Sequence, residues 1–102
     1  MPTGRLPKVK RWMALAIKLD GLIRSGAIAS YSDVADLGHV TRARISQIMN
    51  LLNLAPDIQE AIVFLPAVER GGDPVILAEL QPIAAEMDWA RQRKAWRRLV
   101  GR

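Results

Sequence analysis

Cysteine is absent from the sequence, and histidine occurs only once, as His39. Without cysteine there can be no disulfide and no thiolate zinc site, and one histidine excludes most histidine-based metal or triad chemistry. No apolar run approaches the roughly 18 residues that a membrane span needs, and no signal-type apolar stretch follows the basic N-terminus. These absences predict a cytoplasmic protein that is not an enzyme and that uses no cofactor and no metal.

What the chain does contain is enough apolar side chain for one compact domain, since half of its 102 residues are hydrophobic. Its net charge of +5 is spread unevenly. Residues 1–30 carry +5 and residues 89–102 carry +6, whereas residues 56–88 carry −6. If the two basic ends share a face, a polyanion such as nucleic acid can bind there; the alternative is that both are solvated helix faces.

Apolar residues recur at three- and four-residue steps along most of the chain, which predicts an all-α fold of about six helices. Strand signals are weak, because no run alternates apolar and polar side chains. The expected helices are 9–25, ended by Gly26; 31–37; 42–52, capped by Thr41; 56–65, with Pro56 in its first turn; one that begins at Asp73-Pro74 and is kinked or interrupted at Pro82; and 89–100, capped by Asp88.

The second and third expected helices have the pattern of a helix-turn-helix, with N-terminal helix 9–25 before them. A steep crossing of two short helices requires a small residue, which Ala35 supplies, and the turn requires a residue such as Gly38. Gly38 lies one place earlier than usual, so His39 occupies the customary glycine position. The expected buried positions are occupied by Val34, Val40, Ile45 and Ile48. We therefore predict a single domain over 1–102, with the motif over about 30–53 and a helical buttress over about 56–100.

The third helix also carries a polar face that suits the major groove of DNA. At about 100° per residue, Ala43, Gln47 and Asn50 lie opposite its core side. Arginine can pair with guanine, glutamine or asparagine with adenine, and alanine can touch a thymine methyl. We predict base contacts from Ala43, Arg44, Ser46, Gln47 and Asn50, and phosphate contacts from Ser32, Thr41, Arg42, Lys8, Lys10, Arg11 and Arg97. The alternative is a plain solvent-facing surface, which any amphipathic helix has.

At these residues the sequence resembles the helix-turn-helix domain of the ParB family of plasmid and chromosome partition proteins. The resemblance covers Ser32 to Ile62, SDVADLGHVTRARISQIMNLLNLAPDIQEAI. That family shows a helix-turn-helix, then a leucine-rich segment, here residues 50–54, then a Pro-acidic-apolar-Gln step, here residues 56–59. The helical tail from Asp73 to Trp96 would match the helices that buttress the motif in that family.

The resemblance implies sequence-specific binding to double-stranded DNA. The family's nucleotide-binding domain and its separate dimerisation domain have no counterpart in these residues, so clamp loading and nucleotide hydrolysis are not implied. The chain is also similar to small stand-alone bacterial proteins of mobile elements. We therefore expect a nucleoid-associated transcriptional regulator, partition-like factor or recombination accessory factor. A homodimer on a two-fold site, and a recombinase or other mobile-element protein as partner, stay open.

A second interpretation makes the protein an adaptor whose basic helix 89–100 binds an acidic partner or a membrane surface. Gln92 and Arg93 interrupt the apolar face of that helix, which weakens the membrane version. We expect Trp89 and Trp96 to anchor this helix in the core. We also expect Leu51 and Leu54 to dock the helix that begins at Pro56, because two exposed leucines would be costly.

Overall fold

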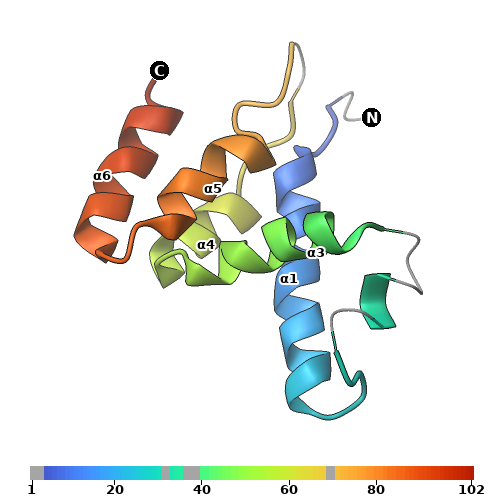
Figure 1. The fold of residues 1–102 in the computed structure, drawn as a ribbon. Helices are drawn as coiled ribbons and strands as arrows, with labels where there is room; N and C mark the ends of the chain where they lie inside the picture. The colour runs from blue at the N-terminus through green and yellow to red at the C-terminus, as the bar shows by residue number, and fades with distance from the viewer. Residues whose placement is uncertain (1–3, 31–32, 36–39, 69–70) are drawn as a thin grey trace.

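The computed structural model describes residues 4–30, 33–35, 40–68 and 71–102, and the fold is all-α, as predicted (Figure 1). The helices are α1 (Lys8–Arg24), α3 (Arg42–Met49), the 3-10 helix η1 (Asn50–Asn53), α4 (Pro56–Val63), α5 (Leu77–Ala85) and α6 (Trp89–Val100). Residues 33–35, inside the expected helix 31–37, are helical. The other residues of that expected helix, Ser32 among them, lie outside the described residues. So do Gly38 and His39, which were expected in the turn.

Helix α1 is the central element of the N-terminal half. Val9, Met13, Ala16 and Leu19 recur every three or four residues and are all buried, so one stripe of the helix faces the core. This stripe packs against α3 and α4. Gly26 follows the helix with a φ of 80°, the left-handed conformation that favours glycine at a helix end, which confirms the expected stop.

The segment before α5 differs from the prediction. Helix α5 begins at Leu77, not at Asp73-Pro74, and it runs through Pro82 to Ala85. Asp73 instead serves α1: its carboxylate accepts the backbone N–H of Lys8 at 3.3 Å and pairs with Arg5. Pro7, which precedes α1, has no side-chain hydrogen-bond acceptor and cannot cap the helix. The backbone N–H of Lys8, the first in α1, is therefore satisfied by the distant Asp73 carboxylate.

Leu51 and Leu54 are buried, as expected, but the surroundings of η1, which carries Leu51, differ from the prediction. Helix α3 ends at Met49 and the chain tightens into η1, whose main contacts are with α5, with the preceding α3 and with α1 rather than with α4. Helix α4 holds this turn by a polar contact instead. The side-chain amide of Gln59 donates to the carbonyls of Leu52 (3.1 Å) and Leu54 (2.9 Å).

Helix α6 packs on α5 at the far end of the molecule from α1 (Figure 1). Asp88 caps it by accepting the N–H of Ala90 at 2.8 Å, as predicted. Trp96 is buried in the core, but Trp89 is 47% exposed, so the prediction of a second tryptophan anchor was wrong. Trp89 is the first residue of α6 and lines an open hollow together with Ala84 and Ala85 from the end of α5.

The anchor that sequence reasoning missed is Gln92, which is fully buried. Its side-chain oxygen accepts the N–H of Ala55 at 2.8 Å. Its amide nitrogen donates to the carbonyls of Asn53 (3.0 Å) and Glu86 (2.7 Å). One side chain thus joins α6 to the η1–α4 junction and to the end of α5.

Along the described parts of the chain, no helix is both long and apolar enough to cross a membrane.

Candidate nucleic-acid interface

Helix α3 is held in place by its N-cap and by its buried side. The Thr41 hydroxyl oxygen accepts the N–H of Arg44 at 3.1 Å, which confirms the predicted cap. Ile45, Ile48 and Met49 are buried and pack the helix against α1 and α5. The position of the helix is therefore fixed by contacts that leave its opposite side uncovered.

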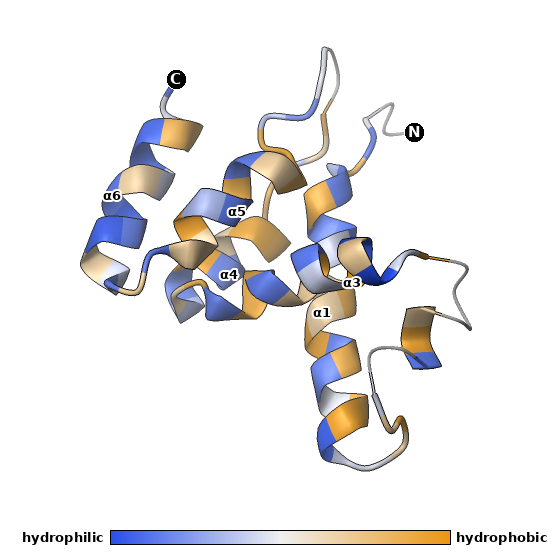
Figure 2. Cartoon of the chain, in the orientation of Figure 1, coloured by the Kyte–Doolittle hydropathy of each residue, from blue (hydrophilic) through white to orange (hydrophobic). Residues whose placement is uncertain are grey.

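That opposite side contains the residues predicted to contact bases. All of them are exposed: Ala43, Arg44, Ser46, Gln47 and Asn50. The polar character of the face is visible as hydrophilic colouring on α3 in Figure 2. The predicted surface thus exists as one continuous polar face, although contact with bases stays a prediction.

The C-terminal part of this face is joined to α5. The side chain of Asn50 donates to Gln81 at 3.1 Å, and Gln81 in turn donates to the backbone carbonyl of Gln47 at 2.9 Å. The Asn50 amide is therefore oriented by α5, whereas the side chains of Arg44 and Gln47 have no hydrogen bond to a residue that the structure describes. Sequence reasoning missed Gln81, because nothing in the sequence reveals which face of α5 meets α3.

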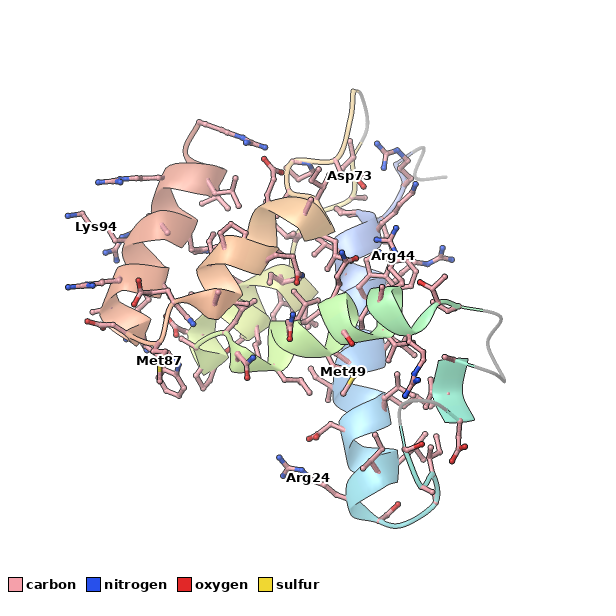
Figure 3. All side chains as sticks on the ribbon, in the orientation of Figure 1. Arg24, Arg44, Met49, Asp73, Met87 and Lys94 are labelled. Atoms are coloured by element: carbon pink, nitrogen blue, oxygen red, sulfur yellow. The ribbon has the colours of Figure 1, made fainter. Side chains whose placement is uncertain are left out.

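The residues predicted to contact phosphate fall into three groups. Thr41 and Arg42 are exposed at the start of α3, and the Thr41 hydroxyl can still donate while its oxygen accepts. Lys8 and Arg11 are exposed near the start of α1, where they line a shallow hollow with Trp12 and Leu15. Helices α1 and α3 are in contact, and Figure 3 shows Arg44 of α3 beside α1.

The remaining two predicted residues, Lys10 and Arg97, lie on different helices, α1 and α6. The Lys10 ammonium donates to the backbone carbonyl of Leu65 at 2.8 Å, at the end of α4. Arg97 is exposed on α6, on the other side of the molecule. In Figure 3, Lys94 of the same helix points outward at one edge, far from Arg44. The two basic ends of the chain therefore do not form one face. Ser32 lies outside the described residues.

The acidic segment 56–88 is largely neutralised by its own chain. Arg93 donates through Nε to both oxygens of Asp57, at 3.1 and 2.9 Å, and Arg102 pairs with Glu79. These arginines lower the pKa of both carboxyls, so both acids are charged and paired at neutral pH. Among the described carboxylates, none lies within ion-pair distance of Arg42 or Arg44. Arg42 and Arg44 therefore carry their charges without an ion pair to any carboxylate that the structure describes.

A second concave surface lies between α5 and α6. Its apolar floor is formed by Pro82, Ile83, Ala95 and Leu99, and its rim carries Arg91, Arg98 and Arg102 with one acid, Glu86. Within the parts of the chain that the structure describes, no group of three histidine or acidic side chains is placed to hold a metal ion.

Comparison of the chain with protein-family models, with curated proteins and with solved structures found no match in any of the three.

Proposed function

We propose that this protein binds double-stranded DNA in a sequence-specific manner, with α3 lying in the major groove. The observation that carries the proposal is the exposed polar face of α3, on a helix whose other side is fixed in the core. Arg44 and Gln47 carry the side-chain groups that read guanine and adenine edges. The residues are neighbours on one rigid surface, as base readout requires.

The surroundings of α3 support the same proposal. The backbone N–H groups of Arg42 and Ala43 have no partner within the helix, because the first amides of any helix lack one. Such amides, with the Thr41 hydroxyl, suit a phosphate. Arg42 of α3, with Lys8 and Arg11 of α1, the helix that α3 contacts, adds exposed positive charge. Phosphate contacts of this kind would fix the register while α3 reads the bases.

The resemblance to the ParB-type helix-turn-helix supports a role in regulation, in partition-like maintenance or as an accessory to recombination. The Pro-acidic-apolar-Gln step of that resemblance is used here to hold the motif. Pro56 begins α4, and Gln59 bonds the carbonyls of Leu52 and Leu54 at the end of the motif. A motif supported in this way by the next helix fits a stand-alone DNA-binding domain.

Selection of bound sequences from a random duplex pool tests the proposal. We expect a recurring motif from the wild-type chain. The matched control is a chain carrying Arg44→Ala and Gln47→Ala, which keeps the buried side of α3 and should select a blurred motif. A wild-type pool without any enriched sequence would overturn sequence-specific binding.

The dependence of affinity on salt tests which surfaces take part. If DNA contacts only the α1–α3 surface, about three to five phosphates are neutralised and log affinity falls against log salt with a slope of about −3 to −5. If the slope of the wild-type chain is steeper than this by about two, and Arg97→Ala makes it shallower again, then α6 also contacts the same duplex. A slope near zero would contradict DNA binding.

The second candidate function is that of an adaptor for an acidic partner, and the groove between α5 and α6 favours it. Three arginines surround an apolar floor there, which suits an amphipathic helix with acidic side chains. Arg91→Glu with Arg98→Glu would abolish such binding and leave the DNA motif unchanged. The two functions are therefore separable in one pair of variants.

A further inference from the structure

The side-chain amide of Gln81 lies between α5 and the end of α3, and two backbone carbonyls determine which way it faces. Its nitrogen donates to the carbonyl of Gln47 at 2.9 Å and to the carbonyl of Leu77 at 3.4 Å. The reversed amide would place its oxygen against two carbonyl oxygens, and neither of these can donate a hydrogen bond. The orientation of the amide is therefore fixed, and Oε1 of Gln81 is on the side of Asn50.

The orientation of Gln81 in turn fixes that of Asn50, the residue that follows α3. An amide oxygen only accepts hydrogen bonds, so the Asn50 group that meets it must be Nδ2, which donates at 3.1 Å. The nitrogen and the oxygen of an asparagine amide lie on opposite sides of the Cβ–Cγ bond. With Nδ2 turned toward α5, Oδ1 is turned away from it. Asn50 is exposed, and its Oδ1 accepts no hydrogen bond from any residue that the structure describes.

An outward-facing oxygen restricts what Asn50 can bind in DNA. Phosphate oxygens of the backbone only accept hydrogen bonds, so they cannot pair with Oδ1. On the base edges in the major groove, the donors are the exocyclic amino groups, N6 of adenine and N4 of cytosine. Each base pair shows one such amino group there. The atom that Asn50 presents therefore suits a base and not the backbone.

We propose that Gln81 is a positioning residue for DNA recognition, which holds Asn50 so that its Oδ1 accepts a hydrogen bond from the amino group of adenine or cytosine. Gln81 acts through Asn50 and does not itself contact a base. A side chain that is already held loses less conformational freedom on binding, so the contact contributes affinity as well as selectivity. This inference rests on the proposed DNA binding and names the chemical group that one position of the α3 face reads.

Deletion of a single amino group from the DNA tests the contact, using the full chain and the site selected from the random duplex pool. Comparison of the motifs selected by wild type and by Asn50→Ala locates the base pair that Asn50 contacts. The amino group of that pair is then removed, by replacing adenine with purine or cytosine with an analogue that lacks the N4 amine. Wild type should bind this duplex about two- to tenfold more weakly, the range of one hydrogen bond. Asn50→Ala should bind both duplexes equally, which controls for the change in the duplex itself.

Gln81→Met tests the positioning role. Methionine fills similar space without an amide, so Asn50 can rotate and the sensitivity to the amino group should largely disappear. In the Asn50→Ala background, Gln81→Met should leave the relative affinity for the two duplexes unchanged, because its effect passes through Asn50. Gln59→Met is the matched control, since Gln59 is also partly buried and also donates to two backbone carbonyls. This control should keep the full response to the amino group.

Nuclear magnetic resonance of the isotope-labelled chain checks the hydrogen bond without DNA. In wild type, one side-chain amide proton of Asn50 should resonate downfield of those of Asn53, an exposed asparagine whose side chain bonds no described residue. Gln81→Met should remove this shift, and Gln59→Met should not. Asn50 protons that match those of Asn53 in wild type would overturn the inference, whether or not Gln81→Met folds.

The binding results separate this inference from the proposed function. A wild-type pool without any enriched sequence overturns both. An enriched motif that Asn50→Ala leaves unchanged, or an amino-group deletion that wild type tolerates, retains the proposed function and overturns the inference. A response to the amino group that is as large in Gln81→Met as in Gln59→Met would show that Asn50 reads the base without Gln81, and would overturn the positioning role.

Discussion

The N-terminal and C-terminal halves of the molecule are held together by different kinds of contact. Around α1 and α3 the fully buried contacts are apolar. The polar contacts there involve exposed or part-buried groups, whether local, as between Asp20 and Arg24, or with distant segments, as between Lys10 and Leu65. From η1 onward, polar side chains link segments far apart in the sequence. Gln92 is the clearest case, because it bonds three backbone groups in two other segments.

The two halves therefore have different roles: the N-terminal half presents the exposed face of α3, and the C-terminal half supports the fold. In the N-terminal half, exposed polar side chains on α3 contribute little to the fold and are free to serve recognition. In the C-terminal half, polar side chains satisfy buried backbone groups, so replacing them has a structural cost. Replacing a polar residue should therefore lower stability in the C-terminal half, whereas on α3 it should weaken DNA binding and leave stability unchanged.

Removal of the C-terminal half is expected to have the largest effect. Truncation after Asn53 removes α4 and α5, against which α1 and η1 pack. Leu51, which is fully buried in the whole chain, would become exposed. The fragment should show no cooperative thermal unfolding, although it still encodes the helix-turn-helix. A 1–53 fragment that melts cooperatively and binds the same DNA would show that the halves are independent modules.

The second largest effect is expected from replacing Leu51, the buried residue of η1. Leu51→Ala should lower the free energy of unfolding by about 2–5 kcal/mol, because it leaves a cavity where η1 meets α5 and α1. Chemical denaturation measures the loss. The control is Leu6→Ala, since Leu6 is 54% exposed and should change stability by less than about 1 kcal/mol. Equal effects of the two substitutions would contradict the packing described for η1.

A polar substitution with a large structural effect should be Gln92→Leu. Leucine fills similar space but leaves the N–H of Ala55 and the carbonyls of Asn53 and Glu86 without a partner. Each unsatisfied buried group costs about 1–3 kcal/mol, so we expect a loss of about 2–5 kcal/mol in urea unfolding. Gln47→Leu on the exposed face of α3 is the control and should be nearly neutral. A neutral Gln92→Leu would show that water can replace this side chain.

Substitutions on the exposed face of α3 should have the opposite effect, because they should weaken DNA binding without lowering stability. Arg44→Ala and Gln47→Ala should each weaken binding to the selected site by about 1–3 kcal/mol and relax preference at one base pair. Neither should change the unfolding midpoint. Arg42→Ala is expected to weaken all sequences about equally, because phosphate contacts carry no sequence information. An unchanged motif in the Arg44 and Gln47 variants would mean that another face enters the groove.

These differences also explain which features sequence reasoning could find. Gly26, Thr41, Pro56 and Asp88 act within one turn of their own helix, and their roles were predicted correctly. Of the predicted buried positions of the motif, Ile45 and Ile48 are buried, whereas Val34 and Val40 are only partly buried. Asp73 was assigned to α5 but serves α1, because its partners Arg5 and Lys8 are distant in sequence. The exposure of Trp89 was equally unpredictable, since spacing alone shows that it shares a side with Trp96 but not where α5 ends.

For the candidate site, the exposed face of α3 followed from helical geometry once its buried residues were known. The sequence did not predict that the two basic ends lie on different sides of the molecule, because the net charge of a segment does not show which way its side chains face in the fold. Gln81 and Gln92 were missed for a related reason. A glutamine in an amphipathic helix gives no signal in the sequence that its amide is used by another segment.

The smallest expected effect is the response of the ion pairs to acid. Hydrogen bonds from Arg93, Arg5 and Arg102 lower the pKa of Asp57, Asp73 and Glu79, respectively. A carboxyl whose pKa is lower in the folded chain contributes stability above its unfolded pKa and loses it as the pH falls through its folded pKa.

Stability should therefore be constant near neutral pH and decline below about pH 4, the ordinary range of these carboxyls. The pairs are open to solvent, so salt should reduce the contribution. Asp57→Asn tests one pair: in urea unfolding at low salt it should lower the midpoint at neutral pH and flatten the decline toward pH 3 relative to wild type. Asp33→Asn is the control, because Asp33 is exposed and has no ion pair with a described residue. If the two variants follow the same pH curve, the ion pair between Asp57 of α4 and Arg93 of α6 contributes nothing measurable to stability.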